Sequence, residues 1–311
     1  MKRFPDNARV CFIGDSLTAW NQVLSRVVDY YRNNFPSSNI KFYNCGTPGA
    51  RVLFSLQNFE NDIAVYNPTH AVVSFGINDA HIGYFAYPRG QERYDKLKQA
   101  YEVYKRDLRT LCEKLEAMNV EITVCTPPPY DEYSKIDVPS MPGCYAMMVE
   151  YAHIVRDLCE EKGYNCCDYN DHLARFINFE NLFPDNDRVH PNAQGYFRMA
   201  ECLLKMQGLD IGEYAPIPDD FKEWHEKVRT FRLIYAGENC VLSDEQKTLP
   251  PEEMYELIRQ YVEKMSPDSV EKNKEEESML SMGKQYLIDK PLYDVHKKDM
   301  LELYEKLFAK K

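Results

Sequence analysis

The stretch Val10-Cys-Phe-Ile-Gly-Asp-Ser-Leu17 runs from four apolar residues directly into a glycine, an acid and a serine. The apolar run has the length of a buried strand, and the residues that follow, to about position 33, predict a helix. A serine at this junction would present its hydroxyl at the carboxyl edge of a sheet, with its own N–H at the positive end of the helix. Two interpretations follow: Ser16 is a nucleophile, or Asp15 or Ser16 only caps the helix.

Short apolar runs and longer helix-like segments alternate to about residue 210. The further runs cover residues 40–43, 70–75, 120–125 and 165–169, and the helical segments lie near 17–33, 51–65, 92–118, 145–162 and 192–207. This alternation predicts an α/β fold in which helices cover a parallel sheet. Ligands of such folds bind at the carboxyl ends of the strands, so the residues that follow each run are the candidates for a site.

Two of these strand ends carry groups that can donate to an oxyanion. Gly46 follows the second run, and a glycine allows its N–H to approach a bound group closely. Asn78, in Gly-Ile-Asn-Asp after the third run, could donate through its amide. Both are also ordinary turn residues, so neither decides the matter alone.

Asp187-Arg-Val-His190 precedes the last helix of this region. A carboxylate three residues before a histidine can accept from one imidazole nitrogen and leave the other free to take a proton from a serine. The alternative is a metal pair, but no further histidine or carboxylate has an obvious ligand spacing with these two residues.

Together these motifs resemble the SGNH hydrolases, also called the GDSL esterase/lipase family. The resemblance covers about residues 8–207 and rests on four motifs in the family's order: Gly14-Asp-Ser-Leu17, Gly46, Gly76-Ile-Asn-Asp79 and Asp187-Arg-Val-His190. It implies a flavodoxin-like three-layer sandwich with about five parallel strands, and hydrolysis of an acyl ester without a cofactor or metal. By analogy Ser16 is the nucleophile, His190 the base and Asp187 its orienting acid, while Ser16 N–H, Gly46 N–H and the Asn78 amide line the oxyanion hole.

The amino-acid composition limits which classes of binding partner are expected. The 311 residues carry a net charge of −11, and this acidic balance argues against nucleic acid as a partner. No apolar stretch has the length of a membrane span and no signal segment is evident, so we expect no membrane insertion. Several of the ten cysteines lie in strand-like runs and read as reduced core residues, which indicates a cytoplasmic protein.

The chain divides into a predicted hydrolase domain, residues 1–209, and a helical C-terminal extension, residues 210–311. Helices are expected to begin near residues 216 and 250, with a third over 293–308. The family resemblance does not cover the extension, which could be a lid, a packing element or the contact of a homodimer.

The substrate is expected to be a small-molecule ester. Tyr84, Arg89 and Tyr130 lie in loops that should flank Ser16, and such aromatic residues suit a sugar. A short acyl group on a carbohydrate is therefore the predicted substrate, although these rings could simply pack the loops. The alternatives are a lysophospholipase or thioesterase with the same mechanism, and an inactive binding module.

Overall fold

The computed structural model describes residues 1–86 and 88–219 and, from the extension, residues 221–222, 224–225, 228, 232, 245–250, 252–254, 256–257 and 260. Its centre is a five-stranded parallel sheet with the strand order β2-β1-β3-β4-β5. The strands are β1 (Arg9–Gly14), β2 (Lys41–Gly46), β3 (His70–Ser74), β4 (Glu121–Cys125) and β5 (Asn165–Cys167). This is the flavodoxin-like order, with its switch point between β1 and β3. The predicted fold class and all five predicted strands are confirmed.

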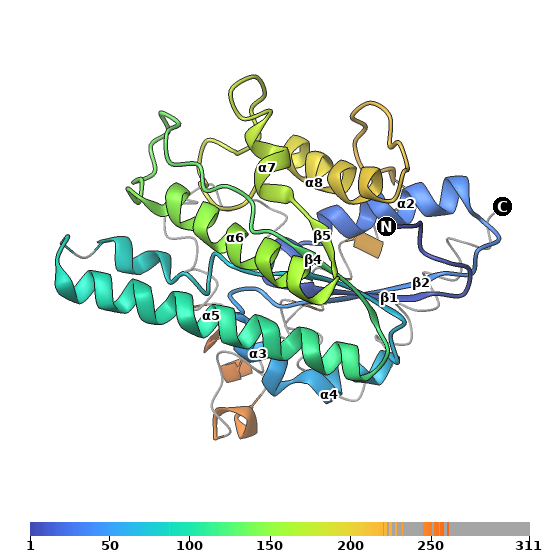
Figure 1. Cartoon of the computed structure of the whole chain (residues 1–311), viewed down its shortest axis with the longest axis horizontal. Helices are drawn as coiled ribbons and strands as arrows, with labels where there is room; N and C mark the ends of the chain where they lie inside the picture. The colour runs from blue at the N-terminus through green and yellow to red at the C-terminus, as the bar shows by residue number, and fades with distance from the viewer. Residues whose placement is uncertain are drawn as a thin grey trace.

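Helices cover both faces of the sheet (Figure 1). One face packs against α2 (Gln22–Asn34), α7 (Tyr169–Ala174) and α8 (Ala193–Met206), and the other against α3 (Val52–Gln57), α5 (Gln91–Ala117) and α6 (Cys144–Lys162). Successive strand residues point to opposite faces. Accordingly Phe12 belongs to the first apolar cluster and Ile13 to the second.

Short helical turns lie at the ends of the strands and in the crossovers. They are α1 (Ser16–Ala19), α4 (Phe59–Asp62), η1 (Ala64–Tyr66), η2 (Ile82–Ala86) and, in the extension, η4 (Gln246–Thr248). The expected continuous helix over 17–33 is wrong, because Asn21 has a φ of +61° and separates α1 from α2. Asparagine tolerates this left-handed conformation, which no α-helix can contain. The break leaves α1 as a single turn whose first residue is Ser16.

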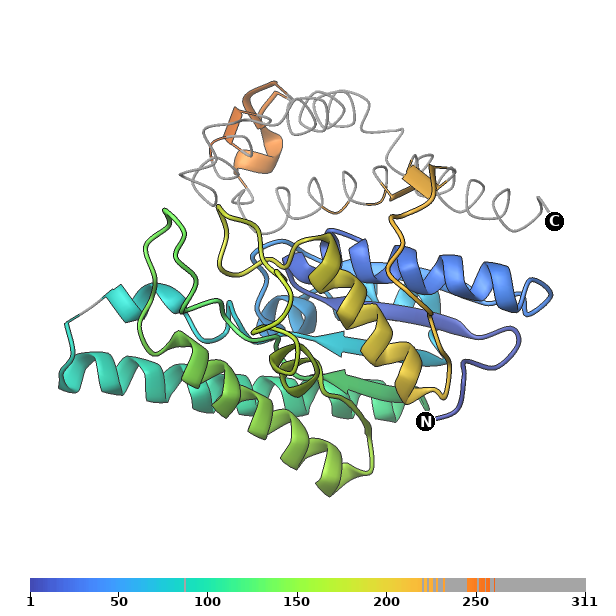
Figure 2. The same ribbon diagram turned by 90° about the horizontal axis from the view of Figure 1, so that it is seen from above.

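The described residues of the extension between 219 and 232 are helical and pack on the α/β domain. Phe221, Trp224 and Val228 are buried in the same apolar cluster as α2 and α8, at the three- and four-residue steps of one helix face. The described parts of the extension lie on the α2 side of the domain (Figure 2). The helix expected over 293–308 lies outside the described residues.

Candidate active site

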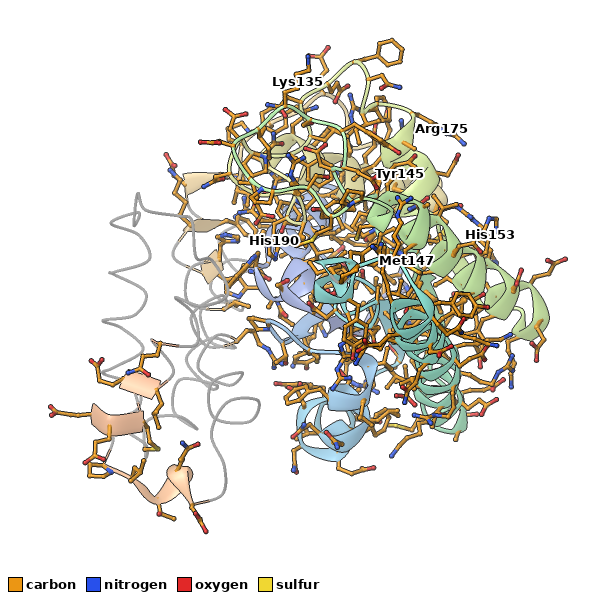
Figure 3. All side chains as sticks on the ribbon, turned by 90° about the vertical axis from the view of Figure 1, so that its left-hand side faces the viewer. Lys135, Tyr145, Met147, His153, Arg175 and His190 are labelled. Carbon is orange, nitrogen blue, oxygen red and sulfur yellow. The ribbon has the colours of Figure 1, made fainter. Side chains whose placement is uncertain are left out.

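Ser16, which follows β1, meets two residues of a loop 174 positions further along the chain, Asp187 and His190. Ser16 Oγ lies 2.8 Å from His190 Nε2, and His190 Nδ1 lies 2.6 Å from Asp187 Oδ2. With the proton of the neutral imidazole on Nδ1, the ring donates to Asp187 and accepts from the Ser16 hydroxyl. His190 lies on the side of the α/β domain nearest the described residues of the extension (Figure 3). The structure thus brings together the three residues that the sequence selects.

Backbone N–H groups of the residues that follow Asp187 hold its carboxylate in place. Its Oδ1 accepts from the backbone N–H groups of Val189 (2.7 Å) and His190 (3.0 Å), which leaves Oδ2 for the imidazole. Burial opposes ionisation of this carboxyl, but the hydrogen bonds from the His190 ring and these N–H groups outweigh it and lower the pKa of Asp187. Asp187 is therefore an anion that fixes the tautomer and the orientation of His190.

Arg188, which the sequence did not single out, ties this loop to its neighbour. The side chain is buried, and it donates to the carbonyls of Asp131 (2.8 Å) and Val138 (2.8 Å). The Asp131 N–H in turn donates to the Arg188 carbonyl at 3.0 Å. A guanidinium that spans several carbonyls can hold an irregular loop in one shape. The position of His190 consequently depends on the segment 131–138.

Asn78 lies beside the loop that follows β2. Its amide Nδ2 donates one hydrogen to the carbonyl of Ala50 at 3.1 Å. An amide carries two hydrogens, so the second remains available to a ligand.

The structure does not support Gly46 as an oxyanion donor. Its N–H already donates to Asn44 Oδ1 at 2.8 Å. The absence of a side chain has a packing reason, because a Cβ at Gly46 would lie 2.4 Å from the Ala19 nitrogen. Gly49, three residues further on, has a φ of +75° that favours glycine, and within the described part of the chain its N–H donates to no protein group. It directly precedes Ala50, whose carbonyl accepts from the Asn78 amide, and the sequence did not single it out.

Two aspartates of the motifs are buried and structural. Asp15 Oδ1 accepts from the Leu17 N–H (3.0 Å) and caps α1, and Asp79 Oδ1 accepts from the Val52 N–H (3.0 Å). The other oxygen of each carboxyl is buried without a hydrogen-bond partner among the described residues. Burial raises the pKa of Asp15 to about 6, and burial together with the charge of Asp15 raises that of Asp79 to about 8.

Asp79→Asn is expected to stabilise the protein increasingly as the pH rises. An unfolded aspartate ionises near pH 4, whereas folded Asp79 holds its proton to about pH 8. Between these values unfolding releases a proton, so Asp79 lowers stability by about 1.4 kcal/mol per pH unit. The amide keeps the Val52 hydrogen bond and removes this slope. Thermal unfolding of both proteins from pH 5 to 8 measures this slope. A difference in unfolding free energy between the two proteins that stays constant with pH would show that Asp79 is ionised throughout. Asp185→Asn, at an exposed position, is the control.

The three residues expected to contact substrate lie in different environments. Tyr130 is only 3% exposed, and its hydroxyl accepts from the Met141 N–H, so it packs a loop, contrary to the expectation. Tyr84 stacks on His81 with ring centroids 4.9 Å apart, and Arg89 is exposed. Trp20, at the end of α1, was not expected, yet its ring centroid lies 6.3 Å from that of His190. Trp20 is therefore an aromatic residue that the structure places beside His190.

Within the described part of the chain, no three His, Cys, Asp or Glu side chains are grouped so that they could hold a metal ion. None of its helices combines the length and apolar character that crossing a membrane requires.

Known proteins that resemble this chain identify its family and its fold. The model of the GDSL-like Lipase/Acylhydrolase family matches residues 12–198. No curated protein sequence gives a significant match. The fold is similar to that of BT4096, described as a gut microbial diltiazem-metabolizing enzyme, at 16% identity and a TM-score of 0.74, with 99% of this chain and 96% of that chain covered. It is also similar to Axe2, an acetylxylan esterase from Geobacillus stearothermophilus, at 22% identity and a TM-score of 0.56, with 69% of this chain and 100% of that chain covered.

Proposed function

Because the chain belongs to the GDSL-like lipase/acylhydrolase family and is therefore an ester hydrolase, we propose that Ser16, His190 and Asp187 are its catalytic triad. The observation that carries the proposal is the continuous pair of hydrogen bonds from Ser16 Oγ through the imidazole to the Asp187 carboxylate. A nucleophile bonded to a base that a third group orients is the geometry that acyl transfer requires.

In this mechanism His190 Nε2 takes the Ser16 hydroxyl proton as Oγ attacks the ester carbonyl carbon. Asp187 stabilises the imidazolium that forms. The tetrahedral intermediate expels the alcohol, which receives the proton from His190, and leaves an acyl group on Ser16. Water then gives a proton to His190 and attacks the acyl-enzyme, which releases the carboxylic acid and restores the Ser16 hydroxyl.

The proposed oxyanion hole consists of the Ser16 N–H, the second N–H of the Asn78 amide and the Gly49 N–H. Gly49 replaces Gly46 in this role, since the Gly46 N–H is occupied by Asn44. The hydrogen bond from Asn78 to Ala50 supports the assignment because it holds the amide next to Gly49. Donors fixed before the reaction stabilise the developing charge without reorganisation.

Asn78→Ala is expected to lower kcat by about 10²–10³-fold, the usual effect of removing one oxyanion donor. KM should change little, because the amide acts on the charge of the transition state. Steady-state kinetics with p-nitrophenyl acetate measure both constants. Asn170→Ala removes a buried amide outside the proposed oxyanion hole, bonded to the Pro127 carbonyl, and should leave kcat near that of the wild type. A fall of only a few-fold in the Asn78 variant would remove this amide from the oxyanion hole.

The proposed substrate is a short acyl ester of a carbohydrate. Trp20 beside His190 offers a flat apolar surface with a polar edge, which suits a sugar ring. The fold shared with an acetylxylan esterase is consistent with this class.

We also propose that the enzyme is cytoplasmic, because every cysteine in the described part of the chain is a free thiol. These cysteines are Cys11, Cys45, Cys112, Cys125, Cys144, Cys159, Cys166, Cys167 and Cys202.

Hydrolysis assays with a series of esters test the substrate class. We expect p-nitrophenyl acetate to be cleaved faster than the butyrate and octanoate, and acetylated xylooligosaccharides to lose acetate. Lysophosphatidylcholine and an acyl thioester are the competing substrates. A rate that rises with acyl length, or preferential cleavage of either competitor, would replace the carbohydrate ester with a lysophospholipase or thioesterase function.

A further inference from the structure

A charged residue of the extension is buried in the α/β domain. The Arg232 side chain is 0% exposed, and its guanidinium forms a two-point ion pair with Asp62 of α4, at 2.6 and 2.8 Å. The same guanidinium donates to Thr47 Oγ1 at 2.7 Å and to the carbonyl of Gly46. One side chain of the extension therefore contacts both α4 and the end of β2.

The segment that Arg232 contacts leads to the proposed oxyanion donors. The Thr47 N–H donates to the Gly14 carbonyl (2.9 Å), two residues before Ser16, and the Thr47 carbonyl accepts from the Ala50 N–H (3.1 Å). The Ala50 carbonyl accepts from the Asn78 amide. These bonds join Arg232 through the segment 46–50 to Gly49 and Asn78.

The ion pair between Arg232 and Asp62 holds the two side chains in a defined geometry. Burial disfavours the charge of Arg232, but the Asp62 carboxylate more than compensates and raises the pKa of the guanidinium. A buried ion pair of this kind contributes little net stability, whereas loss of one partner leaves the other charge buried and alone. A planar fork that also satisfies a carbonyl and a hydroxyl sets the geometry of the loop more closely than apolar packing would.

We propose that Arg232 is a positioning residue for the oxyanion hole, and that the extension thereby forms part of the active-site scaffold. The guanidinium fixes Gly46 and Thr47, and through them the direction of the Gly49 N–H and the Asn78 amide. This inference rests on the proposed function, because it assigns the segment 46–50 to the stabilisation of the oxyanion.

The test replaces the ion pair and keeps the apolar volume. Arg232→Met/Asp62→Leu removes both charges together and leaves the Gly46 carbonyl and Thr47 hydroxyl without their donor. Trp224→Leu is the matched control, because it weakens the packing of the same extension in the apolar cluster with α2. Each variant is made in the full-length chain, its folding is checked by circular dichroism, and kcat and KM are measured with p-nitrophenyl acetate. Each is then combined with Asn78→Ala.

We expect the double variant to lose about 10- to 100-fold in kcat, the scale of a displacement near 1 Å, with little change in KM. Its effect should be smaller when Asn78 is already alanine, since both changes act on the same transition-state interaction. An unchanged kcat, a loss equal to that of Trp224→Leu, or full additivity with Asn78→Ala would overturn the inference. If the double variant does not fold, Thr47→Val removes only one acceptor of Arg232, and the same comparison with Trp224→Leu decides.

Ser16→Ala separates this inference from the proposed function. Activity that depends on Ser16 but not on Arg232 would leave the proposed function intact and overturn the positioning role alone. Activity that does not depend on Ser16 would overturn both.

Discussion

Ser16→Ala is expected to abolish ester hydrolysis, with kcat lowered by about 10⁴–10⁶-fold, because the variant has no nucleophile for the acyl-enzyme. His190 and Asp187 remain in place but have no hydroxyl to activate. The substituted hydroxyl is buried, and its only bond among the described residues is to His190, so the fold should be retained. Parallel assays of both proteins with p-nitrophenyl acetate and an acetylated xylooligosaccharide measure the loss.

Ser25→Ala is the matched control for this prediction. Ser25 is also a buried serine bonded to a histidine, with Oγ 3.0 Å from His225 Nδ1, but it lies on α2 and outside the site. Activity close to that of the wild type in Ser25→Ala, together with its loss in Ser16→Ala, would identify the hydroxyl that reacts. Equal activity of wild type and Ser16→Ala would exclude Ser16 as the nucleophile.

Asp187→Asn is expected to lower kcat by about 10⁴-fold while preserving the shape of the site. The carboxylate accepts the Nδ1 proton and leaves Nε2 free to accept from Ser16. An amide nitrogen facing Nδ1 would favour the tautomer with its proton on Nε2, which cannot act as a base toward the hydroxyl. The loss of negative charge would also destabilise the imidazolium that forms during attack.

The pH dependence and a control distinguish this role from a structural one. Asp185→Asn changes an exposed carboxyl in the same loop and should retain activity. Part of the Asp187→Asn loss should be recovered at alkaline pH, where hydroxide can replace the missing base. A loss of less than tenfold, or a similar loss in Asp185→Asn, would show that Asp187 does not orient the base.

The architecture could be predicted from the sequence because each strand can be recognised by its amino-acid composition. The runs 10–13 and 71–73 are continuously apolar, as expected of parallel strands buried on both faces, and the five strand-like runs recur at the spacing of crossover helices. The residues of the proposed triad could be selected from the sequence by their motifs. Ser16 and Asn78 follow strands, the segment 187–190 precedes a helix, and the order of these motifs is specific to the family.

The parts that could not be predicted depend on contacts that leave no local pattern. Arg232 is one of many charged residues in the extension, and only the structure shows that its guanidinium is buried against Asp62. The choice between Gly46 and Gly49 depends on the direction of two N–H groups. That direction is set by Asn44 and by a positive φ, neither of which the spacing of the glycines reveals.

Covalent labelling of the nucleophile shows whether hydrolysis proceeds through an acyl group on Ser16. The protein is treated with diethyl p-nitrophenyl phosphate, and the adduct is located by intact-mass and peptide mass spectrometry while residual esterase activity is followed. We expect one diethylphosphoryl group per chain, on Ser16, with activity lost in proportion to labelling. Inactivation with the adduct on another residue, or full labelling of Ser16 with activity retained, would contradict it.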